Sequence, residues 1–351
     1  MKKIGLLLFN IVVATALMVA VGAPAVLGIG IGALSGVLPG LPSGVAGMAI
    51  QKEIWENDII EGLWAENSFL NYAFNADQYV LAGKVVHIPQ AGAAPNAVTN
   101  RSTLPATVTV RTDTDVTYAI DEITSDPVLI PNADTVELSY DKRNSVLAET
   151  KAAIYETSAL NILFKWNPTV ATQILRTSGA AIVAHTDLAT GNRKALTIAD
   201  VKAAQKLMNK NKVPSADRYI MIDADMYDQL TTDLSATQWR DFSTAIDPAT
   251  GIAGKLYGFN IIMRAQVARY TNDAVPVPKS WATAGAATDN ASAIAWQKNS
   301  VERALGTVSF FEKIGDPQFF GDVYSALVRL SGRIRRADSK GVIAIVQAAS
   351  V

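Results

Sequence analysis

The sequence contains no cysteine among its 351 residues. That absence excludes disulfide bonds, cysteine-ligated zinc and thiol nucleophiles. Histidine is nearly as scarce, because only His87 and His185 occur, and they lie far apart in the chain. A histidine-based metal site or catalytic triad would have to be built around one of them, whereas such sites normally draw on several ligands at recognisable spacing. We therefore predict no enzymatic activity and no catalytic, cofactor-binding or metal-binding residues.

An excess of basic charge is also missing. Lysine and arginine total 31 against 32 aspartate and glutamate, which gives a formal net charge of -1 at pH 7. A protein that coats DNA normally carries a strong basic excess. A wall that merely encloses DNA does not need one, since tight phosphate binding would hold the nucleic acid and impede its packing. Near-neutrality therefore argues against a DNA-coating protein and is compatible with a container.

Charged residues are absent between Lys3 and Lys52, where Leu, Val, Ala, Ile and Gly dominate. A helix that spans a bilayer needs about 20 apolar residues, and the segment from Ile4 nearly supplies them. The lysines before it and the small residues after it resemble a secretory signal peptide. The chain becomes charged and aromatic at Met48, so we predict that residues 1–47 are an extension absent from the functional subunit, through an upstream start codon or processing. A true signal peptide and a retained hydrophobic arm are the alternatives.

The segment 51–74 has a loosely helical pattern of large apolar residues among Glu and Asn. Its apolar positions are Ile54, Trp55, Ile59, Leu63, Phe69 and Leu70. So short an arm cannot form a core of its own. We expect it to lie either on its own fold or on a neighbouring subunit.

Two predicted strands, Lys84–Ile88 and Ala106–Thr117, flank a loop rich in Gly, Ala, Asn and Pro. Together they predict an extended hairpin, and an isolated hairpin is marginal in water unless another surface covers it. The second strand alternates valine with polar residues, so neither face is apolar enough for a buried sheet. This favours a hairpin that projects onto a neighbour over a mobile loop.

Regular elements follow in the middle of the chain. Apolar spacing predicts a long helix over residues 144–166. A second helix is expected after Thr197, with Asp200 completing a capping-box arrangement. A buried strand over residues 219–222 then leads into a short helix from about Ala224.

Asp223 and Asp225 flank the start of that short helix. A carboxylate pair is one element of a metal or acid–base site. Carboxylates at a strand-to-helix turn more often cap the helix, and we predict that role.

Four arginines, Arg329, Arg333, Arg335 and Arg336, precede a final apolar strand over residues 342–346. They face DNA or neighbouring subunits in one interpretation, and form a solvated strand face in the other.

Several stretches carry a resemblance by their joint order. They are the arm IQKEIWENDIIEGLWAENSFLNYAF, the helix region YDKRNSVLAETKAAIYE, the unit LTIADVKAAQKLMNKNKVPSADRYIMIDADMYDQL, the segment LYGFNIIM and the ending GDPQFFGDVYSALVRLSGRIRRADSKGVIAI. In this order they resemble the major capsid proteins of tailed bacteriophages, whose shared fold is the Hong Kong 97 type. The resemblance covers essentially residues 48–351.

The resemblance implies an α+β fold with an N-terminal arm over residues 48–75 and an extended loop over 76–125. A peripheral domain, built on the long spine helix, would comprise residues 126–195 and 306–351. An axial domain would comprise residues 196–305. The apolar leader departs from the family, many of whose members precede the arm with a charged, helical scaffolding segment.

The same resemblance implies a structural protein of the virion that assembles in the host bacterial cytoplasm. Its copies would form hexamers and pentamers that tile an icosahedral shell around double-stranded DNA, without sequence specificity. Its implied partners are itself and portal, scaffolding and decoration proteins. Two alternatives remain: an encapsulin-like nanocompartment shell of the same fold, and an exported or membrane-anchored surface protein, which the leader alone favours.

Deletion of residues 91–104, in the predicted hairpin loop, should leave soluble subunits that fail to form normal particles. The reason is that a projecting hairpin supplies contacts to neighbours and little to its own core. Electron microscopy of the purified variant checks this, and intact shells would contradict it.

Overall fold

The structure is a computed structural model, and it describes residues 45–81, 84–90, 97–102, 105, 108, 110, 114–131, 142–336 and 338–350. The chain divides into two units, Met1–Trp55 and Glu56–Val351. Helix α3 (Val45–Glu66) begins in the first unit, and the sheets lie in the second. Of the predicted leader, residues 1–47, the part up to residue 44 lies outside the described residues. Within the described part, none of the helices is both long and apolar enough to cross a membrane.

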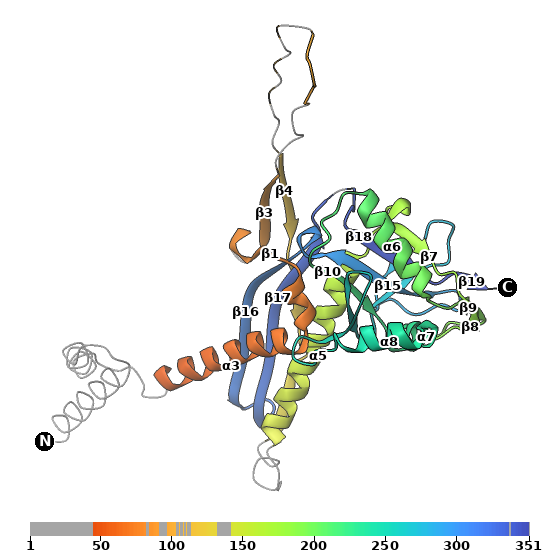
Figure 1. The fold of residues 1–351 in the computed structure, drawn as a ribbon. Coiled ribbons are helices and arrows are strands. Elements are labelled where there is room, and N and C mark those ends of the chain that lie inside the picture. Colours follow the sequence, from red (N-terminus) through yellow and green to blue (C-terminus); the bar gives the residue numbers. More distant parts are fainter. Residues whose placement is uncertain are drawn as a thin grey trace, which may run out of the picture. The chain divides into compact units, whose positions relative to one another are not determined.

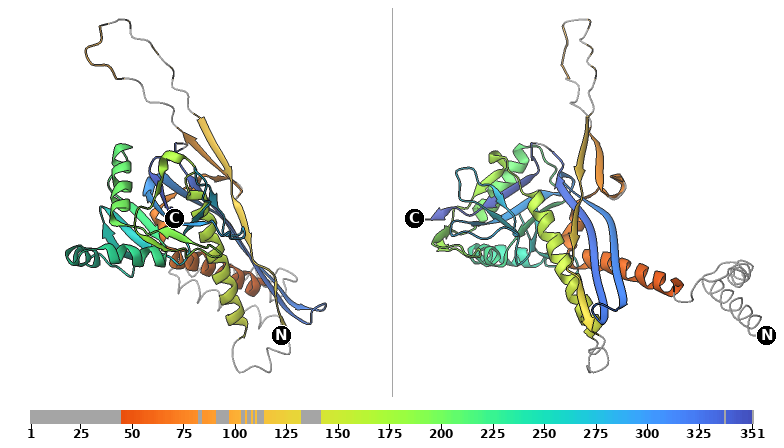
Figure 2. Two further views of the ribbon diagram at one scale, coloured as in Figure 1. Left: turned by 90° about the vertical axis from the view of Figure 1, so that its right-hand side faces the viewer. Right: turned by 180° about the vertical axis from the view of Figure 1, so that it is seen from behind.

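Two long antiparallel strands and one long helix form the first structural layer of the second unit (Figure 1). The strands pair from Val301 opposite Ile334 to Asp316 opposite Gly321. Helix α5 lies against them, as Figure 2 shows from two further sides. The predicted helix 144–166 is thereby confirmed. This sheet and its helix comprise β16 (Val301–Asp316), β17 (Gly321–Ile334), β1 (Phe74–Asn75), β5 (Asp121–Thr124), β6 (Val128–Pro131) and α5 (Lys142–Trp166).

Period-two burial explains how β17 packs. Tyr324, Ala326, Val328 and Leu330 are all buried, while the residues between them are partly exposed. Successive side chains of a strand point to opposite faces, so one face of β17 enters the core and the other meets water.

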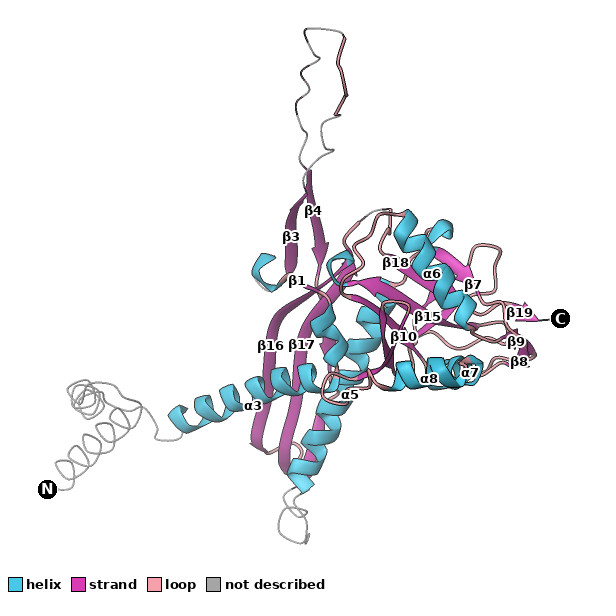
Figure 3. Ribbon diagram, in the orientation of Figure 1, coloured by secondary structure: helices cyan, strands magenta, loops and turns pink. Residues whose placement is uncertain are grey.

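A second, eight-stranded sheet forms the other layer, with helices packed on it (Figure 3). Its central path is β11-β12-β10-β15-β13-β14, and β18 pairs with β15 and β7. All residues of β10, β15 and β18 are buried, as expected of strands covered on both faces. The bounds are β7 (Ile174–Arg176), β10 (Arg218–Ile222), β11 (Ile252–Leu256), β12 (Phe259–Met263), β13 (Ala268–Tyr270), β14 (Pro278–Lys279), β15 (Asn290–Gln297), β18 (Val342–Val346), α6 (Ile198–Lys210), α7 (Ala224–Asp233) and α8 (Ala236–Ser243).

Local sequence signals in this layer are confirmed. The buried strand before α7, the start of α7 and the final strand β18 lie where the sequence placed them. At the start of α6 the Asp200 carboxylate accepts the backbone N–H of Thr197 at 3.0 Å. That bond satisfies a backbone donor before the helix, which is half of a capping box.

Two small sheets complete the described fold. One contains β2 (Val80–Leu81), β3 (Val85–Gln90) and β4 (Thr114–Ala119), and the other contains β8 (Ala181–Val183), β9 (Asn192–Lys194) and β19 (Ala349–Ser350). The predicted strand Ala106–Thr117 is wrong in its first part, because Val108 and Val110 are described but lie in no strand. The pairing ends at Gln90 opposite Thr114, so the described part of β3 offers no partner to the residues before Thr114.

Trp166, at the end of α5, joins the layers. Its side chain is fully buried, and its indole Nε1 donates a hydrogen bond to the Glu302 carbonyl at 3.0 Å. Its ring packs edge-on against Phe69 at 5.8 Å and lies 5.6 Å from Trp296 of β15. A Cβ on Gly332 would meet the indole Nε1 at 2.8 Å, so glycine is needed where the strand passes beneath the ring.

A buried carboxylate fastens the β3–β4 hairpin to the long strands. Glu302 is fully buried and pairs with Arg333, whose Nε lies 2.6 Å from Oε1, and with Arg335 at 3.4 Å. The Arg333 guanidinium lies 5.2 Å from the ring centre of Tyr118 on β4. Burial, and then the negative charge of Glu302, raise the pKa of Tyr118. The tyrosine therefore stays neutral, and the two arginines balance the carboxylate.

Trp166→Phe should lower the free energy of unfolding by about 1–3 kcal/mol, because it leaves the buried Glu302 carbonyl without its donor. Trp166→Ala should cost about 3–5 kcal/mol, since a cavity is added. Urea unfolding of the dispersed subunit measures both. Trp239→Phe, at a side chain 43% exposed, serves as the control and should change stability by less than about 0.5 kcal/mol. Equal stability of wild type and Trp166→Phe would contradict the assigned bond.

Glu302→Gln should destabilise the subunit by about 3–5 kcal/mol, because it leaves Arg333 and Arg335 without their shared counter-charge. A double-mutant cycle with Arg333→Met should show a coupling of about 0.5–3 kcal/mol. The control is Glu122→Gln, whose exposed pair with Arg329 should contribute at most about 1 kcal/mol. Strictly additive losses at Glu302 and Arg333 would refute the pairing.

Candidate assembly surfaces

The turn between β16 and β17 is fixed by its own hydrogen bonds. The Asp316 carbonyl accepts the N–H of Phe320 at 2.8 Å, and its carboxylate accepts the N–H of Gln318 at 2.9 Å. Lys313 pairs with the same carboxylate at 2.8 Å. The bond to Lys313, and then the Gln318 N–H, hold the pKa of Asp316 below its usual value. The carboxylate therefore stays ionised and keeps the turn in one conformation.

This rigid turn presents aromatic rings to solvent. Phe319 is 54% exposed and Phe320 77%. Phe320 also adopts a left-handed backbone conformation, with φ of 52°, which is unusual for a bulky residue. An apolar group held in water by a strained, hydrogen-bonded turn is typical of a contact surface. We call Phe319 and Phe320 the aromatic tip.

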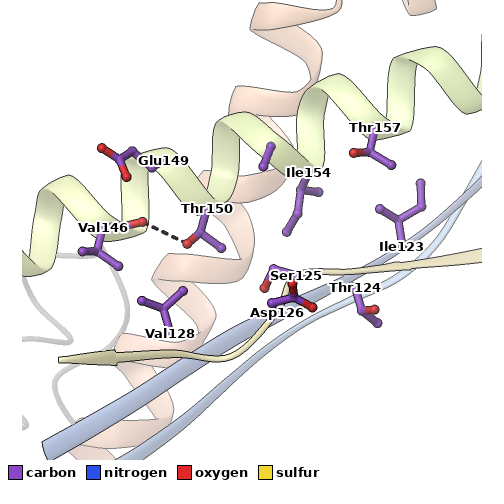
Figure 4. A pocket seen from close by; sticks show the side chains of 11 residues that line it. Ile123, Thr124, Ser125, Asp126, Val128, Val146, Glu149, Thr150, Ile154 and Thr157 are labelled. Carbon is purple, nitrogen blue, oxygen red and sulfur yellow. Dashed lines mark hydrogen bonds between the residues drawn. The ribbon is translucent and has the colours of Figure 1, made fainter. Parts of the chain in front are cut away.

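A groove of about 450 Å³ lies between α5 and the β5–β6 connection (Figure 4). Its walls combine apolar side chains such as Val128 and Ile154 with hydroxyls. The Thr150 hydroxyl donates to the Val146 carbonyl at 2.9 Å, and the Ser125 hydroxyl accepts the N–H of Ala326 at 2.9 Å. These two hydroxyls therefore hydrogen-bond to the backbone of their own fold.

The arm predicted from the sequence packs on its own unit from residue 56 onward. Ile59, Leu63, Phe69 and Leu70 are buried there. The Arg303 guanidinium lies 3.9 Å from the ring centre of Trp64. Of the two alternatives left open by the sequence, attachment to its own fold is confirmed for this stretch.

The four arginines before β18 each pair with a carboxylate of the same chain. Besides Arg333 and Arg335 on Glu302, Arg329 donates to Glu122 at 2.8 Å and Arg336 donates to Asp338 at 3.0 Å. These pairs favour the second of the two interpretations, in which the arginines form a solvated strand face of their own subunit. The four arginines thus share three carboxylates of their own chain, because Arg333 and Arg335 both pair with Glu302.

Asp223 caps α7, as predicted, because its Oδ1 accepts the N–H of Met226 at 2.7 Å. His185, 38 residues earlier, also reaches this carboxylate, because its Nε2 lies 3.0 Å from Asp223 Oδ2. No pattern in the sequence predicts that contact. Burial lowers the pKa of His185, but the hydrogen bond and charge of Asp223 outweigh burial and raise it overall. Asp225 lies close by, in the first turn of α7. His87 lies in β3, away from this cluster in the sheet topology.

Comparison with known proteins identifies the family. The family model described as phage capsid protein matches residues 80–345. Comparison with curated protein sequences gives no match. Three similar solved structures are the capsid of the cyanophage P-SCSP1u (18% identity, 80% of this chain and 87% of that chain, TM-score 0.55), the capsid of Ralstonia phage GP4 (13%, 80% and 88%, 0.56) and the capsid of cyanophage Pam1 (13%, 81% and 93%, 0.52).

The fold and the family agree. The mixed helix-and-sheet architecture is that of phage capsid structures of the Hong Kong 97 type, as predicted. The family match covers the β3–β4 hairpin, the spine helix α5 and both large sheets apart from β1 and the last residue of β18. The chain therefore belongs to the phage capsid protein family and is a structural major capsid protein.

Proposed function

We propose that this chain tiles the shell of a phage head as hexamers and pentamers, which close into an icosahedral particle around double-stranded DNA. The observation that carries the proposal is the aromatic tip, in a chain whose family is defined by shell formation. A fixed apolar turn needs a covering surface, because burying apolar area is favourable by about 25 cal/mol per Å². In a shell, that surface belongs to another copy of the chain.

The strand pairing supports a division of the subunit into two functional parts. A peripheral part holds α5 and the β16–β17 sheet, and an axial part holds the eight-stranded sheet around β10 and β15. Residues 196–305 lie mostly in the axial part. Pairing of β18 with β15 and β7 supports assigning those two strands to it as well. The β3–β4 hairpin serves as the extended loop and residues 48–75 as the arm.

Assembly from such parts relies on many modest contacts. Heterologous contacts that close around a rotation axis generate rings, and linked weak contacts give a stable particle without locking errors in place. A fixed tip and a hairpin anchored at its base both suit this role, since little conformational entropy is lost when they dock.

The enclosed DNA is held by containment and not by sequence recognition. The near-neutral charge and the internal pairing of the four arginines support this. The subunit performs no catalysis in this proposal. We place its assembly in the cytoplasm of the bacterial host and its final location in the virion, with portal, scaffolding and decoration proteins as further partners.

Electron microscopy of the purified protein tests the proposal. Closed particles of uniform size are expected, and the contents of particles recovered from lysates separate the phage shell from an encapsulin-like compartment. DNA is expected inside the phage shell, and an enzyme inside the compartment. A compact monomer at every concentration and salt condition would overturn the proposal.

The double variant Phe319→Ser/Phe320→Ser should abolish particle formation, because it removes the apolar rings of the aromatic tip. Its thermal midpoint as a dispersed subunit should stay within about 2 °C of wild type, as is usual for exposed positions. The matched control, Phe319→Leu/Phe320→Leu, keeps apolar side chains and should still assemble. Electron microscopy and light scattering compare the three proteins. Normal particles from the serine variant would exclude the aromatic tip as an assembly contact.

A further inference from the structure

Three segments distant in sequence converge on one cavity in the larger sheet. The loop after β8 brings His185 and Thr186, the β10–α7 junction brings Asp223 and Asp225, and the segment between β12 and β13 lines the remaining side. Strands β10 and β12 run parallel, so their carboxyl ends lie at the same edge. Ligands of α/β sheets commonly bind outside the carboxyl ends of parallel strands.

The side chains at this edge have the composition of a metal site. One ligand atom each from His185, Asp223 and Asp225 lies within 4.8 Å of the others. Two ligands about 2.0–2.1 Å from a shared ion are themselves about 3 Å apart, and the 3.0 Å between His185 Nε2 and Asp223 Oδ2 fits that requirement. Asp225 is the exposed member of the group.

The central ligand is oriented in advance. Asp223 is only 8% exposed, and its Oδ1 is fixed by the N–H of Met226 at the start of α7. The N-terminal end of a helix also favours a negative charge. The carboxylate is therefore oriented with Oδ2 toward His185. Hydrogen bonds of this kind orient the ligands of protein metal sites.

A second feature of the cavity points to a bound group. Thr186 lines it and is 7% exposed, yet its hydroxyl has no hydrogen-bond partner among the described residues. The same holds, within that part of the chain, for Nδ1 of His185 and for Nε1 of Trp281 in the cavity wall. Native proteins leave few buried polar atoms unpaired, and each needs an explanation. A bound, hydrated cation explains these unpaired atoms, because its water molecules can form hydrogen bonds with them.

The positive charge that packs on Trp281 in the cavity wall is already paired. The Arg269 guanidinium lies 4.8 Å from the ring centre of Trp281. Its Nε lies 3.7 Å from the carboxylate of Asp289, and both side chains are 2% exposed. Asp187 also lines the cavity, but the group whose ligand atoms lie close together consists of the His185 imidazole and the carboxylates of Asp223 and Asp225.

We propose that His185, Asp223 and Asp225 bind a divalent transition-metal ion of the Zn²⁺ type, with a water molecule held by Thr186 in the remaining position. The imidazole selects this class, because Mg²⁺ and Ca²⁺ prefer oxygen ligands. The ion joins the loop after β8 to the β10–α7 junction, and so stiffens this end of the larger sheet. This inference goes beyond the proposed shell function and does not depend on it.

The test uses the full chain, freed of metal with a chelator and then titrated with ZnCl₂ by calorimetry, with metal content measured after dialysis. Wild type should bind about one Zn²⁺ per chain, and its thermal midpoint should rise by at least about 3 °C at saturation. Asp225→Asn and His185→Gln should each weaken binding by at least about tenfold. MgCl₂ should not substitute.

Matched controls are Asp228→Asn, which removes the same charge one turn further along α7, and His87→Gln, which removes the other histidine. Both should bind Zn²⁺ as wild type does. Asp225 is exposed, so its variant tests the site even if His185→Gln does not fold. Absence of a one-equivalent Zn²⁺ isotherm in wild type, or unchanged binding by Asp225→Asn, would overturn the proposal. Equal binding of Mg²⁺ would do the same.

Discussion

The described fold depends on the contact between the end of α5 and the start of β16. There the Trp166 indole donates to the Glu302 carbonyl, and the Glu302 carboxylate is balanced by two arginines. The ring also touches Phe69 and Trp296, so one side chain links the spine helix, the residues after α3 and the larger sheet. A buried charge without its partners is strongly unfavourable, so loss of either arginine would destabilise this junction. Arg333 also lies 5.2 Å from the ring centre of Tyr118 on β4, which links the junction to the β3–β4 hairpin.

A shell subunit needs such a junction for a mechanical reason. The contact surfaces proposed above lie at the ends of long elements, and those ends can be positioned only if the elements are rigid at their base. The aromatic tip extends this logic, because Asp316 fixes the turn that carries Phe319 and Phe320. Rigid surfaces lose little entropy on docking, so weak individual contacts are sufficient for assembly.

The charge distribution supports the proposal that the shell encloses DNA without binding it tightly. Arginines that form a cluster in the sequence are separated in space into ion pairs with Glu122, Glu302 and Asp338. Much of their charge is therefore used inside the chain. The proposed cation site belongs to the eight-stranded sheet, whereas Arg329 and Arg333 lie on β17 of the other large sheet.

The sequence by itself determined the local elements and the family. Periodicity placed α5 and β18, and cap residues placed the starts of α6 and α7, because these depend on neighbours within a few residues. The strand predicted over Ala106–Thr117 begins too early, because β4 begins at Thr114. The end of a strand depends on the length of its partner strand, which local sequence does not record. Only the tertiary structure decided that residues from 56 onward pack on their own fold, that the arginines are internally paired, and that His185 meets Asp223. Each of these depends on contacts between segments distant in the chain, and neither composition nor spacing records such contacts.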